Sequence, residues 1–115
     1  MVAYRVTQDE LSDAEVDRMF RALADATRRD IVRRTLGAEA TVSELASAYS
    51  MTFAGVQKHV NVLEAAGLVS KTARGRERII RGEPGRIREA QALLDRFETI
   101  WRSRIERLDA LLTDD

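Results

Sequence analysis

The stretch from residue 52 to residue 81 concentrates side chains that can bind a nucleic acid. Gln57, Lys58 and Asn61 recur at helical spacing, on the side opposite a line of apolar residues. A glutamine or asparagine amide can pair with the edge of an adenine, and a lysine can reach a guanine or a phosphate. Further along, four basic side chains flank a glycine and can follow a phosphate backbone or enter a minor groove; they are Lys71, Arg74, Arg76 and Arg78.

The first turn of the same helix adds candidates for close contact. Thr52 is a helix cap, and the amide groups that follow it can bind a phosphate. Phe53 and Ala54 face outward, and the small side chain of Ala54 lets this turn approach another surface. His59 is the single histidine of the chain and falls between the inward and outward lines. We favour a bond from His59 to a phosphate over a purely structural contact in the core.

Helix caps predict the elements that precede these residues. A capping box of Ser12 and Glu15 starts a first helix. Its apolar stripe consists of Val16, Met19, Phe20, Leu23 and Ala24. A second helix begins around residues 25–27, and we expect it to end at Gly37 in the left-handed conformation. Its inward side chains are Ile31, Val32 and Leu36.

Two more helices and a hairpin follow. Thr41 with Glu44 caps a short third helix, and Thr52 caps a fourth that ends at Gly67. The inward face of the fourth helix is formed by Val56, Val60 and Leu63. Beyond Gly67 the apolar period changes from 3.6 to 2, which predicts strands at 68–73 and 77–81 joined by a turn at 74–76.

The last part of the chain, residues 86–112, is predicted to form one long helix. Apolar residues spaced by seven give it a continuous stripe; they are Ile87, Leu94, Trp101 and Leu108, with Ala90, Phe97, Ile105 and Leu112 between them. Such a helix is too long for a small head to cover, so the stripe needs a partner, and a second copy of the chain would supply one. The six side chains that we expect in this dimer interface are Ile87, Leu94, Phe97, Trp101, Ile105 and Leu108. For Trp101 we favour interface core, with a ligand pocket as the alternative.

The chain has 115 residues, of which 19 are basic and 19 acidic, so its net charge is zero. This length allows one domain, and the composition excludes a collagen-like or membrane-spanning chain. By segment the balance is uneven: residues 1–50 carry a charge of −2, residues 51–88 of +5 and residues 89–115 of −3. The positive excess coincides with the fourth helix and the hairpin. Neutrality therefore predicts a basic surface confined to one face, not the absence of a polyanionic partner.

Several kinds of chemistry are excluded by composition. The chain has no cysteine, which excludes disulfides, thiolate nucleophiles and metal sites built on sulfur. It has no phosphate-binding glycine loop and no recognisable catalytic triad, so we expect no enzyme and no cofactor. Residues 1–11 lack the apolar core of a signal peptide, and we expect a cytoplasmic protein with no membrane partner.

Three runs of sequence are typical of a known family: LADATRRDIVRRTL at 23–36, TVSELAS at 41–47 and MTFAGVQKHVNVLEAAGLVSKTARGRE at 51–77. Over about residues 16–82 the chain resembles the ArsR/SmtB family of bacterial winged-helix transcriptional regulators. The resemblance implies a homodimer that binds an inverted-repeat operator, represses transcription and is released by an unknown small-molecule inducer. Its DNA-reading positions correspond to Phe53, Ala54, Gln57, Lys58, His59 and Asn61, and its wing corresponds to residues 71–81.

The chain departs from the family pattern in two places. Phe53, Ala54 and Gly55 stand where polar residues or proline are more usual, so the resemblance carries over no operator sequence. Metal-responding members have a Cys-x-Cys pair in the third helix, and the equivalent residues here are Ala46 and Ala48. With no histidine in residues 86–115 either, the chain resembles the cysteine-free subgroup, and we expect no metal site.

The sequence thus predicts a mainly α fold with a small β-hairpin. We expect a single winged helix-turn-helix domain over residues 1–115, with a head at about 12–82 and a dimerisation helix at about 86–112. A polar helix face is usually only solvated, and an Arg-Gly-Arg turn is a common hairpin tip, but the order of the elements favours DNA binding. The alternative is a winged helix that binds another protein, for which an exposed Phe53 would be suited.

Overall fold

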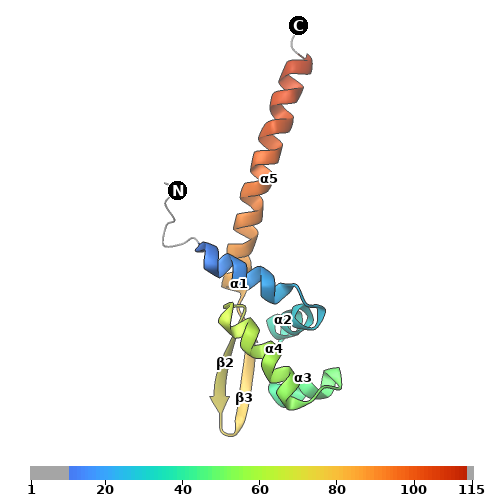
Figure 1. Ribbon diagram of the computed structural model, residues 1–115, viewed down its shortest axis with the longest axis vertical. Coiled ribbons are helices and arrows are strands. Elements are labelled where there is room, and N and C mark those ends of the chain that lie inside the picture. The colour runs from blue at the N-terminus through green and yellow to red at the C-terminus, as the bar shows by residue number, and fades with distance from the viewer. Residues whose placement is uncertain (1–10, 114–115) are drawn as a thin grey trace.

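The computed structural model describes residues 11–113 and is mostly helical with one small sheet. The elements in chain order are α1 (Asp13–Leu23), α2 (Ala26–Gly37), β1 (Ala40–Thr41), α3 (Val42–Tyr49), α4 (Phe53–Ala65), β2 (Val69–Arg74), β3 (Glu77–Gly82) and α5 (Pro84–Thr113). Figure 1 shows a head built from α1 to α4 and the hairpin, with α5 projecting from it. This arrangement confirms the predicted fold class.

The sheet has three antiparallel strands in the order β1-β3-β2. β2 and β3 form the predicted hairpin, with Val69 opposite Gly82 and Arg74 opposite Glu77. Gly75 occupies the turn with φ of +63°, a conformation that glycine adopts without strain. β1 was not predicted, because a strand of two residues has no periodicity of its own and forms by pairing Ala40 with Ile80.

The predicted helix starts are confirmed by their hydrogen bonds. Ser12 and Thr41 each form a complete capping box, with Glu15 and Glu44 respectively. Thr52 caps α4. The second helix ends at Gly37 as predicted, but the expected left-handed conformation was wrong, because Gly37 has no positive φ. The chain leaves α2 in an extended conformation that leads straight into β1, so no left-handed turn is needed.

The core lies where the four helices of the head meet the sheet. Its largest fully buried side chains are Met19, Ile31, Leu63, Leu68, Ile80, Val42, Val56 and Val60. The predicted inward face of α4 is therefore confirmed. Phe20 of α1, Ala24 just after α1 and Leu36 of α2 are exposed, against expectation. α1 and α2 turn only part of their apolar stripes toward this small head.

α5 begins at Pro84, two residues before the predicted start. A proline at the first helical position loses no intrahelical hydrogen bond, so it begins this helix. Ala90 is the one buried residue of α5 among the described residues, and Ile87 packs against the core. The rest of the helix extends away from the head, and the molecule measures 71 × 30 × 21 Å.

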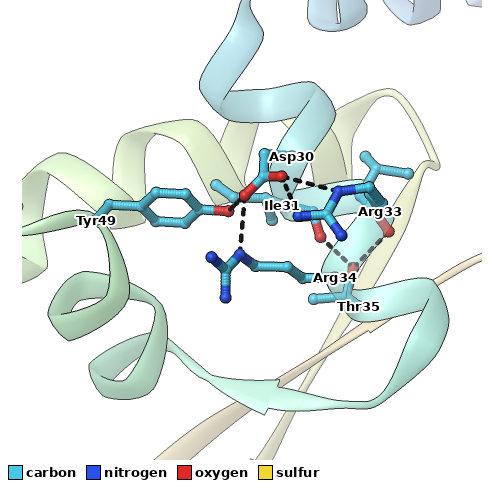
Figure 2. Close-up of polar contacts among 7 residues, drawn as sticks. Asp30, Ile31, Arg33, Arg34, Thr35 and Tyr49 are labelled. Carbon is cyan, nitrogen blue, oxygen red and sulfur yellow. Dashed lines mark hydrogen bonds and ion pairs between the residues drawn. The ribbon is translucent and has the colours of Figure 1, made fainter.

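A polar cluster around Asp30 joins α2 to α3 (Figure 2). The hydroxyl of Tyr49 donates to Oδ2 of Asp30, and Nε of Arg34 donates to the same oxygen at 2.8 Å. Arg33 binds the other carboxylate oxygen. The hydrogen bonds from Tyr49, Arg34 and Arg33 hold the pKa of Asp30 well below its ordinary value. The cluster fixes the helix before α4 and so helps to set the position of α4.

Candidate nucleic-acid interface

The start of α4 presents the outward side chains that the sequence predicted. Oγ1 of Thr52 accepts a hydrogen bond from the backbone N–H of Gly55 at 3.0 Å, which fixes the first turn. Phe53 and Ala54 are exposed, and so is Lys58 one turn further on. Ala54 and Lys58 lie on the side of α4 that faces away from Val56 and Val60 of the core. Phe53 lies above Val56 on the inward side, and it is exposed as the first residue of the helix.

Gln57 is half-buried, so the expectation that it points fully outward was wrong. Its Oε1 is buried and accepts no hydrogen bond from the described residues. An unpaired amide oxygen in such a place costs free energy, which makes a rotation of this side chain toward an outside donor favourable.

His59 lies at the rim of α4, half-buried, as expected. Its Nδ1 is 3.5 Å from Nη1 of Arg28 on α2. Arg28 also donates through Nε to the carbonyl of Ala22 at 2.7 Å, so its guanidinium is held at the end of α1. The contact ties α4 to the junction of α1 and α2, and a bond from His59 to a phosphate stays a prediction.

The hairpin is tied to α4 by one basic side chain. Nζ of Lys71 donates to Oδ1 of Asn61 at 3.0 Å and lies 3.7 Å from the carboxylate of Glu64. The Lys71 side chain is only 19% exposed, whereas Asn61 is exposed. Two residues predicted to contact DNA therefore bind each other across the gap between α4 and β2. We infer that their first effect is to set the angle between helix and hairpin.

The other arginines of the hairpin are exposed. Arg76 and Arg78 lie near its tip and make no ion pair with any residue in the range 11–113. Arg74 instead binds Oε1 of Glu39 at 3.1 Å, and Arg81 binds Oε2 of Glu39 at 2.7 Å. The hydrogen bond from Arg74, and to a smaller extent that from Arg81, holds the pKa of Glu39 below its ordinary value. The carboxylate is therefore charged at neutral pH.

Glu39 and Arg28 are two residues of this surface that the sequence did not reveal. Glu39 is 35 positions from Arg74 and belongs to no motif, so no local signal could have pointed to it. Arg28 stands in the run TRRD, where no sequence pattern marks it as part of this surface. Its backbone N–H donates to Oδ1 of Asp25 at 3.0 Å, which caps α2.

The described residues form neither a metal-ion cluster nor a membrane-spanning helix. Within residues 11–113 no three histidine, aspartate or glutamate side chains gather closely enough to hold a metal ion. None of the helices described is both long and apolar enough to span a bilayer.

Comparison with known proteins shows which family has this arrangement. A helix-turn-helix domain model matches residues 23–72. The HTH-type transcriptional regulator Rv2034 of Mycobacterium tuberculosis is 37% identical over 83 residues, which cover 72% of this chain and 78% of that protein. The crystal structure of the ArsR family transcriptional regulator RHA00566 superimposes with a TM-score of 0.76 at 32% identity, covering 82% of this chain and 97% of that chain. The chain belongs to the ArsR family of winged helix-turn-helix transcriptional regulators.

The ArsR assignment agrees with further structures. An ArsR-like transcriptional regulator from Rhodococcus sp. RHA1 has a TM-score of 0.76 at 28% identity and covers 89% of this chain and 96% of that chain. The family resemblance seen in the sequence is thereby confirmed, and this ArsR-family chain is a DNA-binding transcriptional regulator. By their order in the fold, α4 corresponds to the recognition helix of a winged helix-turn-helix domain, and the hairpin of β2 and β3 corresponds to its wing.

The ArsR-family chain leaves the outer part of α5 uncovered. Five of the six side chains predicted for a dimer interface are exposed; they are Leu94, Phe97, Trp101, Ile105 and Leu108. Ile100, Leu111 and Leu112 add to the same exposed apolar surface. Ile87 differs from the prediction, because it is half-buried against the core of its own head.

Proposed function

We propose that this regulator acts as a homodimeric repressor on an inverted-repeat operator. One recognition helix of the dimer enters the major groove in each half-site, and the wing lies on the backbone or in the minor groove. The observation that carries the proposal is the shared exposure of the α4 start and the wing tip. Both lie in the segment 51–88, which has a charge of +5 in an otherwise acidic chain.

Each contact in this proposal follows from the chemistry of a side chain. Arg76 and Arg78 are exposed cations that would bind phosphates and contribute to affinity for every sequence. Lys58 and Gln57 lie further along α4, where an ammonium or an amide can distinguish base edges. Three further groups would contact DNA phosphates. They are the protein N–H groups after Thr52, Lys71 beside Asn61, and Arg74 once its ion pair with Glu39 is broken.

The dimer is supported by the uncovered face of α5. A soluble monomer rarely exposes a Trp, a Phe and six aliphatic side chains along one helix. A related winged helix-turn-helix protein from Mycobacterium bovis, Mb0332, is described as homodimeric and shares the fold at 24% identity, with a TM-score of 0.60 over 78% of this chain and 91% of that chain. Pairing α5 with a second copy would place two recognition helices about 34 Å apart, which matches successive major grooves.

From the ArsR family we also infer that DNA binding represses transcription. An unknown small-molecule inducer would release the protein from its operator. An operator-binding protein works where chromosomal DNA lies, so we propose the cytoplasm as its compartment. Catalysis has no part in this function, because its two elements, a recognition helix and a wing, act by binding.

Selection of bound duplexes from a random pool tests the proposal. We expect a consensus with two inverted half-sites and an affinity that falls steeply with salt. Replacing Arg76 and Arg78 with Ala should weaken binding to all duplexes and reduce the slope of log K against log salt by about one per phosphate contact. Replacing Gln57 with Ala should change the preferred base at one position in each half-site.

An arginine on α5, away from α4 and the wing, provides the control. Arg102 lies on α5, exposed and paired with Glu98, so Arg102→Ala should leave both the affinity and the salt slope unchanged. If the wild-type dimer showed no salt-dependent binding to any duplex, operator binding would be excluded, and the protein-binding alternative would take its place.

A further inference from the structure

Phe53 is an exposed aromatic residue at the N-terminal end of the recognition helix. Its side chain is 53% exposed. Of the twelve large apolar side chains exposed in residues 11–113, eight lie on α5, where a partner copy would cover them. Phe53 is separate from that group and cannot be explained in the same way.

Its place in the fold separates Phe53 from the apolar face of α5. The guanidinium of Arg86, at the start of α5, lies against Gly67, just beyond the C-terminal end of α4. Phe53 is at the opposite end of a 13-residue helix, about 20 Å away. Figure 1 shows the start of α4 beside α3, on the side of the head away from the root of α5.

The first turn of α4 sets the direction in which the Cβ of Phe53 leaves the backbone. Thr52 caps this turn through Gly55, and a Cβ added at Gly55 would come within 3.1 Å of the Thr52 hydroxyl, so the turn is closely packed. A helical Cβ leans toward the N-terminus, and Phe53 therefore points beyond the end of the helix that enters the groove. Ala54 beside it is exposed and small, so it leaves the ring accessible.

The surroundings of Phe53 favour a nucleic acid as its contact. Lys58 is exposed on the same helix, and the segment 51–88 has a charge of +5. In a major groove the base edges offer hydrogen-bonding groups, and the one apolar group is the 5-methyl of thymine. A phenyl ring that reaches the base edges gains most from contact with that methyl group, because both surfaces then leave water.

We propose that Phe53 contacts the 5-methyl group of a thymine in each half-site and so selects thymine at that position. This inference rests on the proposed operator binding. Phe53 is then a specificity-determining residue that reads one base by apolar contact, while Gln57 and Lys58 read others by hydrogen bonds.

Replacing thymine by deoxyuridine tests the contact, because it removes only the methyl group. The probe is the duplex recovered by the random-pool selection, with each thymine replaced in turn, in one half-site and then in both. The wild type should bind about fourfold more weakly when the contacted thymine of one half-site is replaced, as expected for one methyl group returned to water. Phe53→Ala should bind both duplexes equally, and Phe53→Leu should retain part of the difference.

Val62 supplies a matched control, since it is also apolar, on α4 and 42% exposed, but lies in the C-terminal half of the helix. Val62→Ala should keep the full penalty for deoxyuridine. The inference is overturned if the wild type binds every substituted duplex as tightly as the parent, or if Phe53→Ala keeps every penalty. Failure of the wild type to bind the parent duplex would instead refute operator binding itself, so the two failures are distinguishable.

Discussion

Glu39 binds Arg74 across 35 positions of sequence, with Oε1 of Glu39 3.1 Å from Nη2 of Arg74. The carboxylate comes from the residue just before β1, and the guanidinium belongs to the wing. The same carboxylate holds Arg81 through its second oxygen. In the free protein Glu39 therefore pairs with Arg74, which the DNA backbone would also bind. A DNA phosphate must displace the Glu39 carboxylate from Arg74.

Replacing Glu39 with Gln should strengthen binding to all duplexes a few-fold at low salt, because Arg74 is then released for a phosphate. The gain should shrink as salt is raised, since both the ion pair and the phosphate contact are exposed and screened. Fluorescence anisotropy with the selected duplex and with a scrambled one would measure it.

The control for this change is Glu77, an exposed wing carboxylate with no ion pair among residues 11–113. Glu77→Gln removes the same charge and should give a smaller gain. In a background with both Arg74→Gln and Arg81→Gln, Glu39→Gln should have no more effect than Glu77→Gln, because neither partner of Glu39 remains to be released. Equal gains from both carboxylates in the wild-type background would mean that only overall charge matters.

Tyr49 should make the free energy of unfolding of the head fall as the pH rises above 10. Burial and the hydrogen bond to Asp30 raise the pKa of Tyr49 to about 12 from its ordinary value of 10.0. A raised pKa of an acid means that the folded state favours the protonated form. This contribution to stability is present in full below pH 10 and is lost as the pH rises toward 12.

We therefore expect the wild type to lose stability between pH 10 and 12 more steeply than Tyr49→Phe, which has no hydroxyl to ionise. Urea unfolding over this range would measure how steeply the free energy of unfolding falls with pH in each protein. An ultraviolet titration should show a phenolate forming near pH 12 in the wild type and not in Tyr49→Phe. Parallel slopes for the two proteins would show that Tyr49 ionises as freely in the folded state as in the unfolded state.

Gly67 follows the end of α4 and packs against Arg86 at the start of α5. Its φ is +75°, and a Cβ at this position would lie 2.5 Å from Nε of Arg86. Arg86 in turn lies 3.5 Å from the carboxylates of both Glu15 and Glu89. An alanine at Gly67 would have to displace this guanidinium from its partners.

Gly67→Ala should therefore destabilise the protein by more than Gly75→Ala, although both residues have a positive φ. Gly75 has open space around it, and its substitution should cost about 1–2 kcal/mol from the backbone conformation alone. In an Arg86→Ala background the two costs should become equal. If chemical denaturation gave equal costs in the wild-type background, Arg86 would move aside without loss.

The exposed face of α5 predicts the oligomeric state. Ile105→Glu places a charge in the centre of this face and should convert the dimer to a monomer, with a loss of roughly a hundredfold in operator affinity because the two half-sites are no longer bound together. Arg102→Glu, on the same helix, should remain a dimer. Sedimentation over a range of concentrations would show this, and a wild-type monomer throughout would contradict the proposed assembly.

Elements whose signals are local could be predicted from the sequence. Capping boxes at Ser12 and Thr41, the cap at Thr52 and the hairpin turn at Gly75 each depend on residues within four positions of one another, so they could be predicted. The long last helix and the basic segment followed in the same way from periodicity and composition.

Contacts between distant elements determine which of those side chains are available to bind DNA. Lys71 and Arg74 look alike in the sequence, yet one binds Asn61 of α4 and the other Glu39 before β1. The half-burial of Gln57 and the exposure of Leu36 likewise depend on elements that are distant in the chain. Periodicity predicts which side of a helix is apolar, but the packing of the other elements determines how much of that side is covered.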